Sequence, residues 1–324
     1  MTGADFVVVL NYKGASDTIA CVESLITGSP SVQVLVVDNG SDDEVVDQIV
    51  RRWPTVHTLQ TGANLGFSGG MNAGVQWALD RSARTVTVLN NDTIVPPGAI
   101  NQLLESAITG RVISPEVRYA GRPDDVWFGG GVIDPETSLP RHLQADELTA
   151  GAFADSASSS AILAGCCLVA TAEVWRTVGL FDDRFFLMFE DSEWSVRASR
   201  LGIPLVVDHD VTISHKVSAS FKGPFIYLGL YYYTRNGLLF GGIVSPWNIT
   251  ARLRFLRRHV LIVPAARVRG GQLLVGVRLA AIVGLAVAAR VFRVFGRAPA
   301  YLERLSSTWA ESDANLEVIV PPRK

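Results

Sequence analysis

The first part of the chain alternates short apolar runs with stretches in which apolar residues recur every three or four positions. The apolar runs have the length of buried strands and cover residues 5–12, 32–39, 56–62 and 84–91. The stretches with helical spacing are residues 16–27, 43–53 and 69–80, with Ser16 placed to cap the first helix. Strands with few polar positions that alternate with helices predict a mostly parallel sheet covered on both faces.

The middle of the chain is less regular. Residues 120–142 are rich in Gly, Pro and Asp, which predicts loops or a hairpin, and residues 155–160 form a polar linker. A strand followed by a helix is expected over 161–179. An aromatic-rich stretch then leads into a helix that ends near Gly202, and residues 203–216 read as a strand.

The C-terminal part has a different character. Residues 225–240 form an aromatic amphipathic segment, and residues 251–297 mix apolar residues with ten arginines. The longest uninterrupted apolar run, 279–289, is shorter than the roughly 20 residues that span a bilayer. Arginine mixed with apolar residues at helical spacing is typical of a helix lying in a membrane interface. The alternative is a basic helical hairpin packed on the catalytic domain or on another subunit.

The distribution of charge also changes close to the start of the C-terminal part. Residues 1–210 hold 27 Asp/Glu and 13 Lys/Arg, whereas residues 211–302 hold 13 Lys/Arg and neither Asp nor Glu. Such asymmetry indicates two regions with different partners, and anionic lipid attracts basic segments. With 48% hydrophobic and 19% charged residues the chain is globular. We expect no nucleic-acid partner.

The cysteines and the N-terminal residues indicate in which cellular compartment the protein lies. The three cysteines, two of which are adjacent, do not have the spacing of metal ligands. A disulfide framework of the kind found in secreted domains is therefore not expected. The N-terminal apolar run has no basic segment before it and is too short for a secretory signal. We therefore expect a cytoplasmic protein, peripheral on the inner face of the cell membrane.

Polar side chains gather where the predicted strands end. They are Asn11, Asp38 and Asn39, Asn64, and the run Asn90, Asn91 and Asp92. Because ligands of open parallel sheets bind outside the carboxyl ends of the strands, a site is expected there. Asp38 could hydrogen-bond a nucleobase or ribose, or could instead satisfy its own loop as an Asx turn.

Two further features suit a diphosphate. The glycines in "TGANLGFSGGMNAG" (61–74) allow the backbone to approach phosphate, and the loop opens a helix whose N-terminus favours anions. Their spacing differs from G-x-G-x-x-G, which argues against a dinucleotide-dependent oxidoreductase. Asp92 beside amide oxygens is an oxygen-rich set suited to Mg²⁺ or Mn²⁺ carried on a diphosphate.

Taken in order, the motifs "VVDNGSDD", "NLGFSGGMNAG", "LNNDT", "GCCLVA", "VGLFDDRFFLMFEDSEW" and "ISHKVSAS" resemble the inverting glycosyltransferases of family 2, which have the GT-A fold. The resemblance covers about residues 5–220. It is greatest to rhamnosyltransferase- and galactofuranosyltransferase-like members of bacterial cell-envelope or polysaccharide assembly.

The resemblance implies a role for each matching residue. Asp191 of "FEDSEW" matches the general base, and Glu190 orients the acceptor or Asp191 itself. Asp92 matches the last aspartate of the family's Asp-x-Asp motif and should bind a divalent metal, with His215 completing the site. Asn90 occupies the first Asp position of that motif, which removes one negative charge. The donor nucleotide is expected to contact Asn11, Asp38, Asn64, Gly66, Asn72, Asn90 and Asn91.

These implications define the expected protein. Residues 1–222 would form a GT-A catalytic domain, and residues 223–324 a helical, Arg-rich region that docks on a membrane or a partner, with a homo-oligomer possible. The domain would transfer a sugar, first of all rhamnose from dTDP-rhamnose, to a hydroxyl of a lipid-linked saccharide acceptor. Two alternatives stay open: a soluble natural-product acceptor, or a catalytically weakened nucleotide- or saccharide-binding subunit, for which Asn90 is the reason.

Overall fold

The computed structural model describes residues 3–149, 157–217 and 225–313. The chain forms two compact units, each described here by itself. The first comprises Met1–Val132, Arg141–Asp183 and Glu190–Val217; the second comprises Ile133–Pro140, Arg184–Phe189 and Ser218–Lys324. The division expected at residue 222 stays a prediction.

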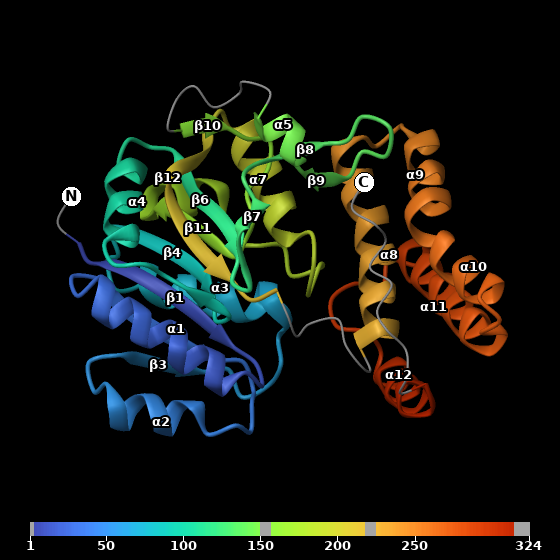
Figure 1. The fold of residues 1–324 in the computed structure, drawn as a ribbon, viewed down its shortest axis with the longest axis horizontal. Coiled ribbons are helices and arrows are strands. Elements are labelled where there is room, and N and C mark those ends of the chain that lie inside the picture. The colour runs from blue at the N-terminus through green and yellow to red at the C-terminus, as the bar shows by residue number, and fades with distance from the viewer. Residues whose placement is uncertain (1–2, 150–156, 218–224, 314–324) are drawn as a thin grey trace. The chain divides into compact units, whose positions relative to one another are not determined.

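The first unit is built on a ten-stranded sheet (Figure 1) with the order β10-β12-β6-β11-β4-β1-β2-β3, to which β5 and β7 are added at β12 and β6. Its strands are β1 (Asp5–Asn11), β2 (Gln33–Asp38), β3 (His57–Gln60), β4 (Thr85–Asn90), β5 (Thr93–Ile94), β6 (Val112–Tyr119), β7 (Arg122–Phe128), β10 (Ala157–Ser159), β11 (Cys167–Thr171) and β12 (Leu205–His215). Strands β4, β1, β2 and β3 are parallel to one another, as are β6 and β12, whereas β11 runs antiparallel between β4 and β6. The expected mostly parallel α/β sheet is confirmed.

Helices cover both faces of this sheet (Figure 1). They are α1 (Ala15–Gly28), α2 (Val45–Arg52), α3 (Gly66–Leu79), α4 (Ala99–Ala107), α5 (Ala145–Thr149), α6 (Ala172–Val178) and α7 (Glu190–Arg200). Helices α1, α2 and α4 lie on one face, and α3, α6 and α7 on the other, as right-handed crossovers require for α1 and α3. The strands between them are almost entirely buried, for example Val7–Val9 and Val34–Val37.

One local expectation needs correction. Ser16 lies inside α1, whose N-cap is Gly14 without a side-chain cap; Asn11 Oδ1 instead accepts from the Gly14 amide at 3.3 Å. The hairpin that was one of the two expectations for residues 120–142 is confirmed: β7 pairs antiparallel with the preceding β6, and β8 (Gly131–Ile133) and β9 (Pro140–His142) form a two-stranded sheet. Of the expected linker 155–160, residues 155 and 156 lie outside the described residues, and Ala157–Ser159 form β10.

The second unit is helical (Figure 1). It contains α8 (Phe225–Val244), α9 (Ile249–Phe255), the π-helix η1 (Leu256–Val260), α10 (Ile262–Arg269), α11 (Leu273–Val291) and α12 (Ala300–Ser312). Helix α8 packs against α11 and α12, and α10 packs against α11. Although its apolar run is interrupted in the sequence, α11 is one continuous helix that is long and apolar enough to cross a membrane. Length and composition are weak evidence when a single helix meets them, and a third of α11 is buried inside the protein.

Candidate active site

The register of the parallel strands brings the predicted polar residues to one edge of the sheet. Asn11 at the end of β1 pairs with Asp38 at the end of β2, and Leu10 pairs with Asn90 at the end of β4. Parallel strands end at the same edge, so three of the expected site residues become neighbours without further loop structure.

A hydrogen-bond network joins the residues at this edge. Asn11 is fully buried, and its amide nitrogen donates to Ser41 Oγ at 3.0 Å, to Asp43 Oδ2 at 3.2 Å and to Asp38 Oδ1 at 3.4 Å. The Thr18 hydroxyl donates to Asn11 Oδ1 at 2.8 Å and accepts from Asn91 Nδ2 at 2.9 Å. Asn11 and Asn91 therefore belong to one cluster. Thr18, Ser41 and Asp43 were not predicted, because their roles depend on the loops that follow β1 and β2.

Asp38 hydrogen-bonds its own loop, which was one of the two roles that the sequence left open for it. Its Oδ1 accepts from the Ser41 amide at 3.1 Å, which is an Asx-type turn, and the side chain is only 4% exposed. The carboxylate thus holds the loop after β2 in shape at the edge where a nucleoside would bind.

Asn39 was noted among the polar residues at the strand ends but was given no role. Its side chain donates to Gly66 O at 2.9 Å and to Asn64 Oδ1 at 3.3 Å, and it accepts from the Leu65 amide at 3.0 Å. Asn64 Oδ1 in turn accepts from the Gly66 amide at 2.9 Å. Asn39 therefore shapes the loop that contains Asn64 and Gly66. Its place beside Asp38 at a strand end was the available signal.

Most of the glycines expected to approach phosphate have a packing role instead. A Cβ on Gly74 would stand 2.3 Å from Val8 Cγ1, and one on Gly70 would stand 2.6 Å from Leu10 Cδ1. Both lie within α3 and let the helix approach β1 closely. Gly66, with a φ of +76°, is the glycine at the turn where α3 begins without a side-chain cap. Because the Leu65 and Gly66 amides are bonded to Asn39 and Asn64, an anion here would have to meet the first-turn amides that follow them in α3.

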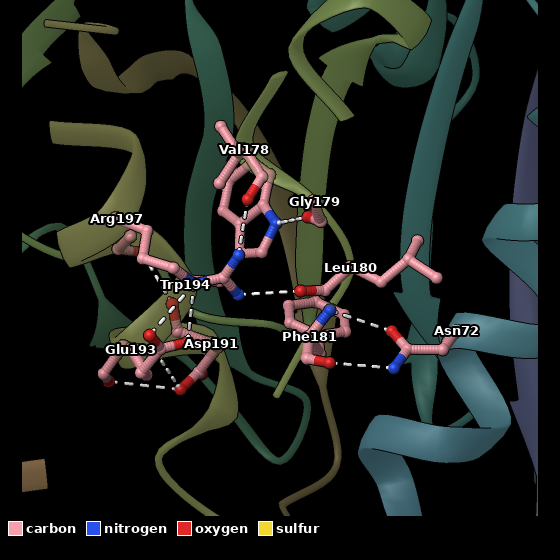
Figure 2. A network of polar contacts seen from close by, with 11 residues as sticks. Asn72, Val178, Gly179, Leu180, Phe181, Asp191, Glu193, Trp194 and Arg197 are labelled. Atoms are coloured by element: carbon pink, nitrogen blue, oxygen red, sulfur yellow. Dashed lines mark hydrogen bonds and ion pairs between the residues drawn. The ribbon is translucent and has the colours of Figure 1, made fainter. Parts of the chain in front are cut away.

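Asn72 is not brought into the cluster at the strand ends. Its amide nitrogen donates to Phe181 O and its oxygen accepts from the Phe181 amide, both at 2.9 Å (Figure 2). The amide nitrogen also donates to Asp183 Oδ1 at 2.7 Å. These bonds join α3 to the segment before α7. The predicted contact of Asn72 with the donor has no support from this geometry.

Asp92 and His215 meet although 123 positions separate them in the sequence. Strand β5 pairs with the end of β12, with His215 opposite Thr93, and the Lys216 amide donates to Asp92 O at 2.9 Å. His215 Nε2 consequently lies 2.9 Å from Asp92 Oδ1 and 3.4 Å from Asn90 Nδ2. Trp127 packs edge-on against the His215 ring, which is 5% exposed.

These three side chains fit a divalent cation that arrives with a diphosphate. Asn90 Oδ1 is buried without a hydrogen-bond partner among the described residues, as is His215 Nδ1. The cluster supplies one carboxylate, one imidazole and one amide oxygen, and Mg²⁺ or Mn²⁺ commonly takes its other ligands from phosphate and water. Within the described ranges no group of three or more His, Cys, Asp or Glu is placed to bind a metal alone. Binding would therefore depend on the donor.

Glu190 and Asp191 differ in their surroundings although they are adjacent. Glu190 is 6% exposed, and its Oε2 has no hydrogen-bond partner within the described chain. Burial, and then repulsion from Asp191, raise the pKa of Glu190 well above its ordinary value. Burial also raises the pKa of Asp191, but hydrogen bonds from the Gly165 amide at 2.8 Å and the Ser192 amide at 2.6 Å oppose that shift. The hydrogen bonds therefore favour the charged form of Asp191, whereas Glu190 Oε2 receives none.

The Gly165–Cys166 dipeptide connects the two halves of the site. The Gly165 amide donates to Asp191 Oδ2, and Cys166 O accepts from the Asn90 amide at 2.9 Å. Burial is the main cause that raises the pKa of the Cys166 thiol, and the neighbouring Cys167 and the charges of Asp191 and Asp92 add to it. Both cysteines are buried in the core.

Figure 2 shows how α7, the helix that carries Asp191, is fixed in place. Arg197 forms an ion pair with Glu193 and donates to Val178 O at 2.5 Å and Leu180 O at 2.7 Å. Trp194, fully buried as core, donates from Nε1 to Gly179 O at 2.6 Å. Asp191 lies in the first turn of this helix rather than at its N-cap, because α7 begins at Glu190. Its carboxylate is thereby oriented by bonds on both oxygens.

The arrangement combines three chemical capacities at one sheet edge. Buried amides and Asp38 line the strand ends, the cluster of Asp92, His215 and Asn90 could hold a cation, and Asp191 is an oriented carboxylate that can take a proton. This combination suits displacement of a diphosphate by a hydroxyl.

Comparison with known proteins gives a consistent result. The profile of the family described as Glycosyltransferase like family 2 matches residues 6–226. An N-acetylglucosaminyl-diphospho-decaprenol L-rhamnosyltransferase of Mycobacterium tuberculosis is 28% identical over 235 residues, covering 64% of this chain and 74% of that protein. The low-salt glycan biosynthesis hexosyltransferase Agl10 of Haloferax volcanii is 27% identical over 212 residues, covering 61% and 62%.

Among solved structures, the mannosyltransferase PcManGT of Pyrobaculum calidifontis in complex with GDP-Man and Mn²⁺ has a TM-score of 0.53. The identity is 15%, and the match covers 97% of this chain and 81% of that one. Such a likeness concerns the fold, which is the expected GT-A fold.

Proposed function

The chain belongs to the glycosyltransferase-like family 2, and from this we propose that it transfers a sugar with inversion from a nucleoside-diphosphate donor to a hydroxyl of a saccharide acceptor. The observation that carries the mechanism is the Gly165–Cys166 dipeptide. It joins the Asp191 carboxylate on one side to the Asn90–Asp92 strand end on the other. A base and a leaving-group site at opposite ends of one short segment suit an in-line displacement.

The donor would bind along the strand ends. Asn11, Asp38 and Asn39 are buried and hydrogen bonded to the loops around them, so the nucleoside meets a surface that is already ordered. The diphosphate would lie towards the start of α3 and Asn91, where backbone amides and an amide side chain can donate. Asn64 and Gly66 would form the edge of this surface.

Asp92, His215 and Asn90 would hold Mg²⁺ or Mn²⁺. When bound, the metal would neutralise charge on the diphosphate leaving group. With an amide at Asn90 in place of a carboxylate, the protein contributes one negative charge to this cluster.

Asp191 would act as the general base. The acceptor hydroxyl oxygen forms a bond to the anomeric carbon from the face opposite the diphosphate, and the carbon–oxygen bond to the diphosphate breaks. The hydroxyl proton passes to Asp191, while the pair of electrons leaves with the nucleoside diphosphate. Burial raises the pKa of the neighbouring Glu190 well above its ordinary value, whereas the Gly165 and Ser192 amides oppose that shift at Asp191.

For the substrates we propose rhamnose from dTDP-rhamnose as the donor sugar and a lipid-linked saccharide as the acceptor. The similarity to the mycobacterial L-rhamnosyltransferase supports both, since its name specifies a diphospho-decaprenol acceptor. A soluble acceptor remains the alternative, and so does a nucleotide-binding subunit with little activity.

A membrane surface would present such an acceptor, and the C-terminal helices carry a surface suited to it. Of the 20 large hydrophobic side chains exposed among the described residues, 14 lie between Trp247 and Leu305. Trp247 is 94% exposed and Phe292 is 78% exposed. Exposed arginines such as Arg254 and Arg258 lie among them. Apolar and basic side chains mixed in this way suit the cytoplasmic face of an anionic membrane.

Transfer assays over a panel of nucleotide sugars test the enzymatic proposal. We expect turnover with one donor, loss of most of it in EDTA, and a product of inverted anomeric configuration. Asp191→Asn should lower kcat by about 10²–10⁴-fold with donor binding retained, because a general base contributes about that much. If Asp191→Asn transferred at the wild-type rate, the base assignment would be wrong; if no nucleotide sugar bound, the enzymatic proposal would fail.

Flotation with vesicles tests the membrane proposal separately. Vesicles containing anionic lipid should retain the full-length protein at low salt, and Leu253→Gln should weaken retention. Leu201→Gln is the matched control, because Leu201 is similarly exposed at 55% but lies outside the C-terminal helices. Failure to bind together with a doubled mass in solution would indicate a second copy on this surface instead.

A further inference from the structure

Two adjacent polar residues in the middle of α8 are fully buried. Arg235 and Asn236 are both 0% exposed, within the segment "YYYTRNG". Arg235 has no carboxylate partner among the described residues; burial lowers its pKa, and the rings of Tyr231 and Tyr232 lie 5.3 Å and 5.1 Å from its guanidinium carbon. A buried charge without an opposite charge is costly, so a specific arrangement must compensate it.

Both side chains bind the backbone of one loop, Arg184–Phe189. Asn236 Nδ2 donates to Phe185 O at 2.7 Å, to Leu187 O at 2.8 Å and to Met188 O at 3.2 Å. Arg235 Nη2 donates to Arg184 O at 3.3 Å and Phe185 O at 3.2 Å, and its Nη1 donates to Gly296 O at 2.7 Å. Arg235 Nε donates to Asn236 Oδ1 at 2.9 Å, which fixes the two side chains to each other.

The loop that they bind has an unusual backbone. Phe186, Met188 and Phe189 have φ values of +60°, +70° and +74°. Bulky residues rarely adopt this left-handed region, and they keep it only where the surroundings impose it. Four carbonyl oxygens of the loop point to Arg235 and Asn236, and the Phe186 ring stacks on Tyr232 with centroids 5.3 Å apart. The donors on α8 therefore satisfy the loop's carbonyl groups in this conformation.

The loop ends where the catalytic helix begins. Phe189 is followed directly by Glu190, the first residue of α7, and then by Asp191. The direction in which the chain enters α7 is set by the φ values of Met188 and Phe189, because each peptide fixes the position of the next.

We propose that Arg235 and Asn236 are positioning residues for sugar transfer, which hold the 184–189 loop so that Asp191 meets the acceptor hydroxyl. This rests on the proposed base role of Asp191. It gives the C-terminal helices a part in catalysis that is separate from any membrane contact. The donor residues lie on other strands and loops, so loss of the loop contacts should affect the chemical step rather than donor binding.

Kinetics of Asn236→Ala and Asn236→Ser test this proposal. A misplacement of about 1 Å costs about 100-fold in rate, so Asn236→Ala should lower kcat by about 100-fold with the KM for the donor within about twofold. Asn236→Ser keeps one hydroxyl donor and should give an intermediate kcat. Tyr227→Phe is the matched control: Tyr227 is a fully buried residue of α8 whose hydroxyl bonds Asp313 and not the loop. It should keep the wild-type kcat.

Hydrogen–deuterium exchange provides a readout that does not need activity. Peptides covering residues 184–196 should exchange faster in Asn236→Ala and Asn236→Ser than in the wild type, and unchanged in Tyr227→Phe. Wild-type kcat in Asn236→Ala, an equal loss in Tyr227→Phe, or unchanged exchange over 184–196 would each overturn the proposal. If the wild type transferred no sugar, the proposed function would fail, while exchange would still decide whether Asn236 holds the loop.

Discussion

Replacing Gly165 by alanine would test the base assignment with a single methyl group. The Gly165 amide donates to Asp191 Oδ2 at 2.8 Å, so the glycine lies directly against the carboxylate. A Cβ at this position would stand 3.1 Å from Asp191 Cβ and 3.4 Å from Asp191 Oδ2. Carbon atoms in contact normally stand no closer than about 3.5 Å, so the Asp191 side chain must retreat by about 0.4 Å.

The size of the effect follows from this displacement. If 1 Å costs about 100-fold in rate, a shift of about 0.4 Å should lower kcat by roughly 6-fold. Stability should change little, because Gly165 lies outside the left-handed region and alanine stabilises such positions by about 0.4–1 kcal/mol through the unfolded chain. That gain roughly offsets the close contact, so Tm should stay within about 3 °C.

Steady-state transfer kinetics and a thermal melt measure both quantities. Gly121→Ala is the matched control, because a Cβ there would meet nothing within 4 Å. The KM for the donor should be unchanged in both variants. A Gly165→Ala protein with wild-type kcat, or one whose loss lay wholly in the donor KM, would refute the reasoning that Asp191 is the positioned base.

Three further predictions concern other residues of the site. Glu190→Gln should flatten the pH dependence of stability. Because the folded-state pKa of Glu190 is raised, the wild type loses unfolding free energy as pH rises above the unfolded value near 4.5, and chemical denaturation at pH 5 and pH 8 should show a larger loss in the wild type than in the variant. Asn90→Asp should tighten Mn²⁺ by about tenfold, because a second carboxylate adds attraction at short range; a Mn²⁺ titration of the transfer rate measures it, and an unchanged midpoint would remove Asn90 from the metal cluster. Asn39→Ala removes the bonds to Gly66 O and the Leu65 amide, and should cost about 1–3 kcal/mol of stability and raise the donor KM; a wild-type KM would mean that the loop does not contact the donor.

The fold followed from local patterns over much of the chain. Continuous apolar runs predicted β1, β2, β3 and β4, and helical spacing predicted the helices between them, because both depend on periodicities a few residues long. Helix starts were less predictable. Ser16 has capping chemistry, but Asn11 holds the Gly14 amide, and that contact comes from a residue in the preceding strand.

The glycines of α3 show how one pattern supports two explanations. Gly70 and Gly74 suited a phosphate loop in the sequence, whereas the structure shows that they allow α3 to pack on β1. Spacing alone does not distinguish these roles, because both need a missing Cβ. Asn72 is similar: its amide bonds the segment before α7, which no local signal predicts.

The sequence by itself determined that polar side chains end the parallel strands, and therefore that Asn11, Asp38 and Asn90 share one edge. It also identified the Glu190–Asp191 pair through the family resemblance. Only the tertiary structure decided that His215 reaches Asp92, since that contact depends on the pairing of β5 with β12. The folded chain also shows that burial raises the pKa of Glu190 and that Arg235 and Asn236 bind the loop before it. The physical reason is the same: strand ends follow from local periodicity, whereas burial and long-range contacts belong to the folded chain as a whole.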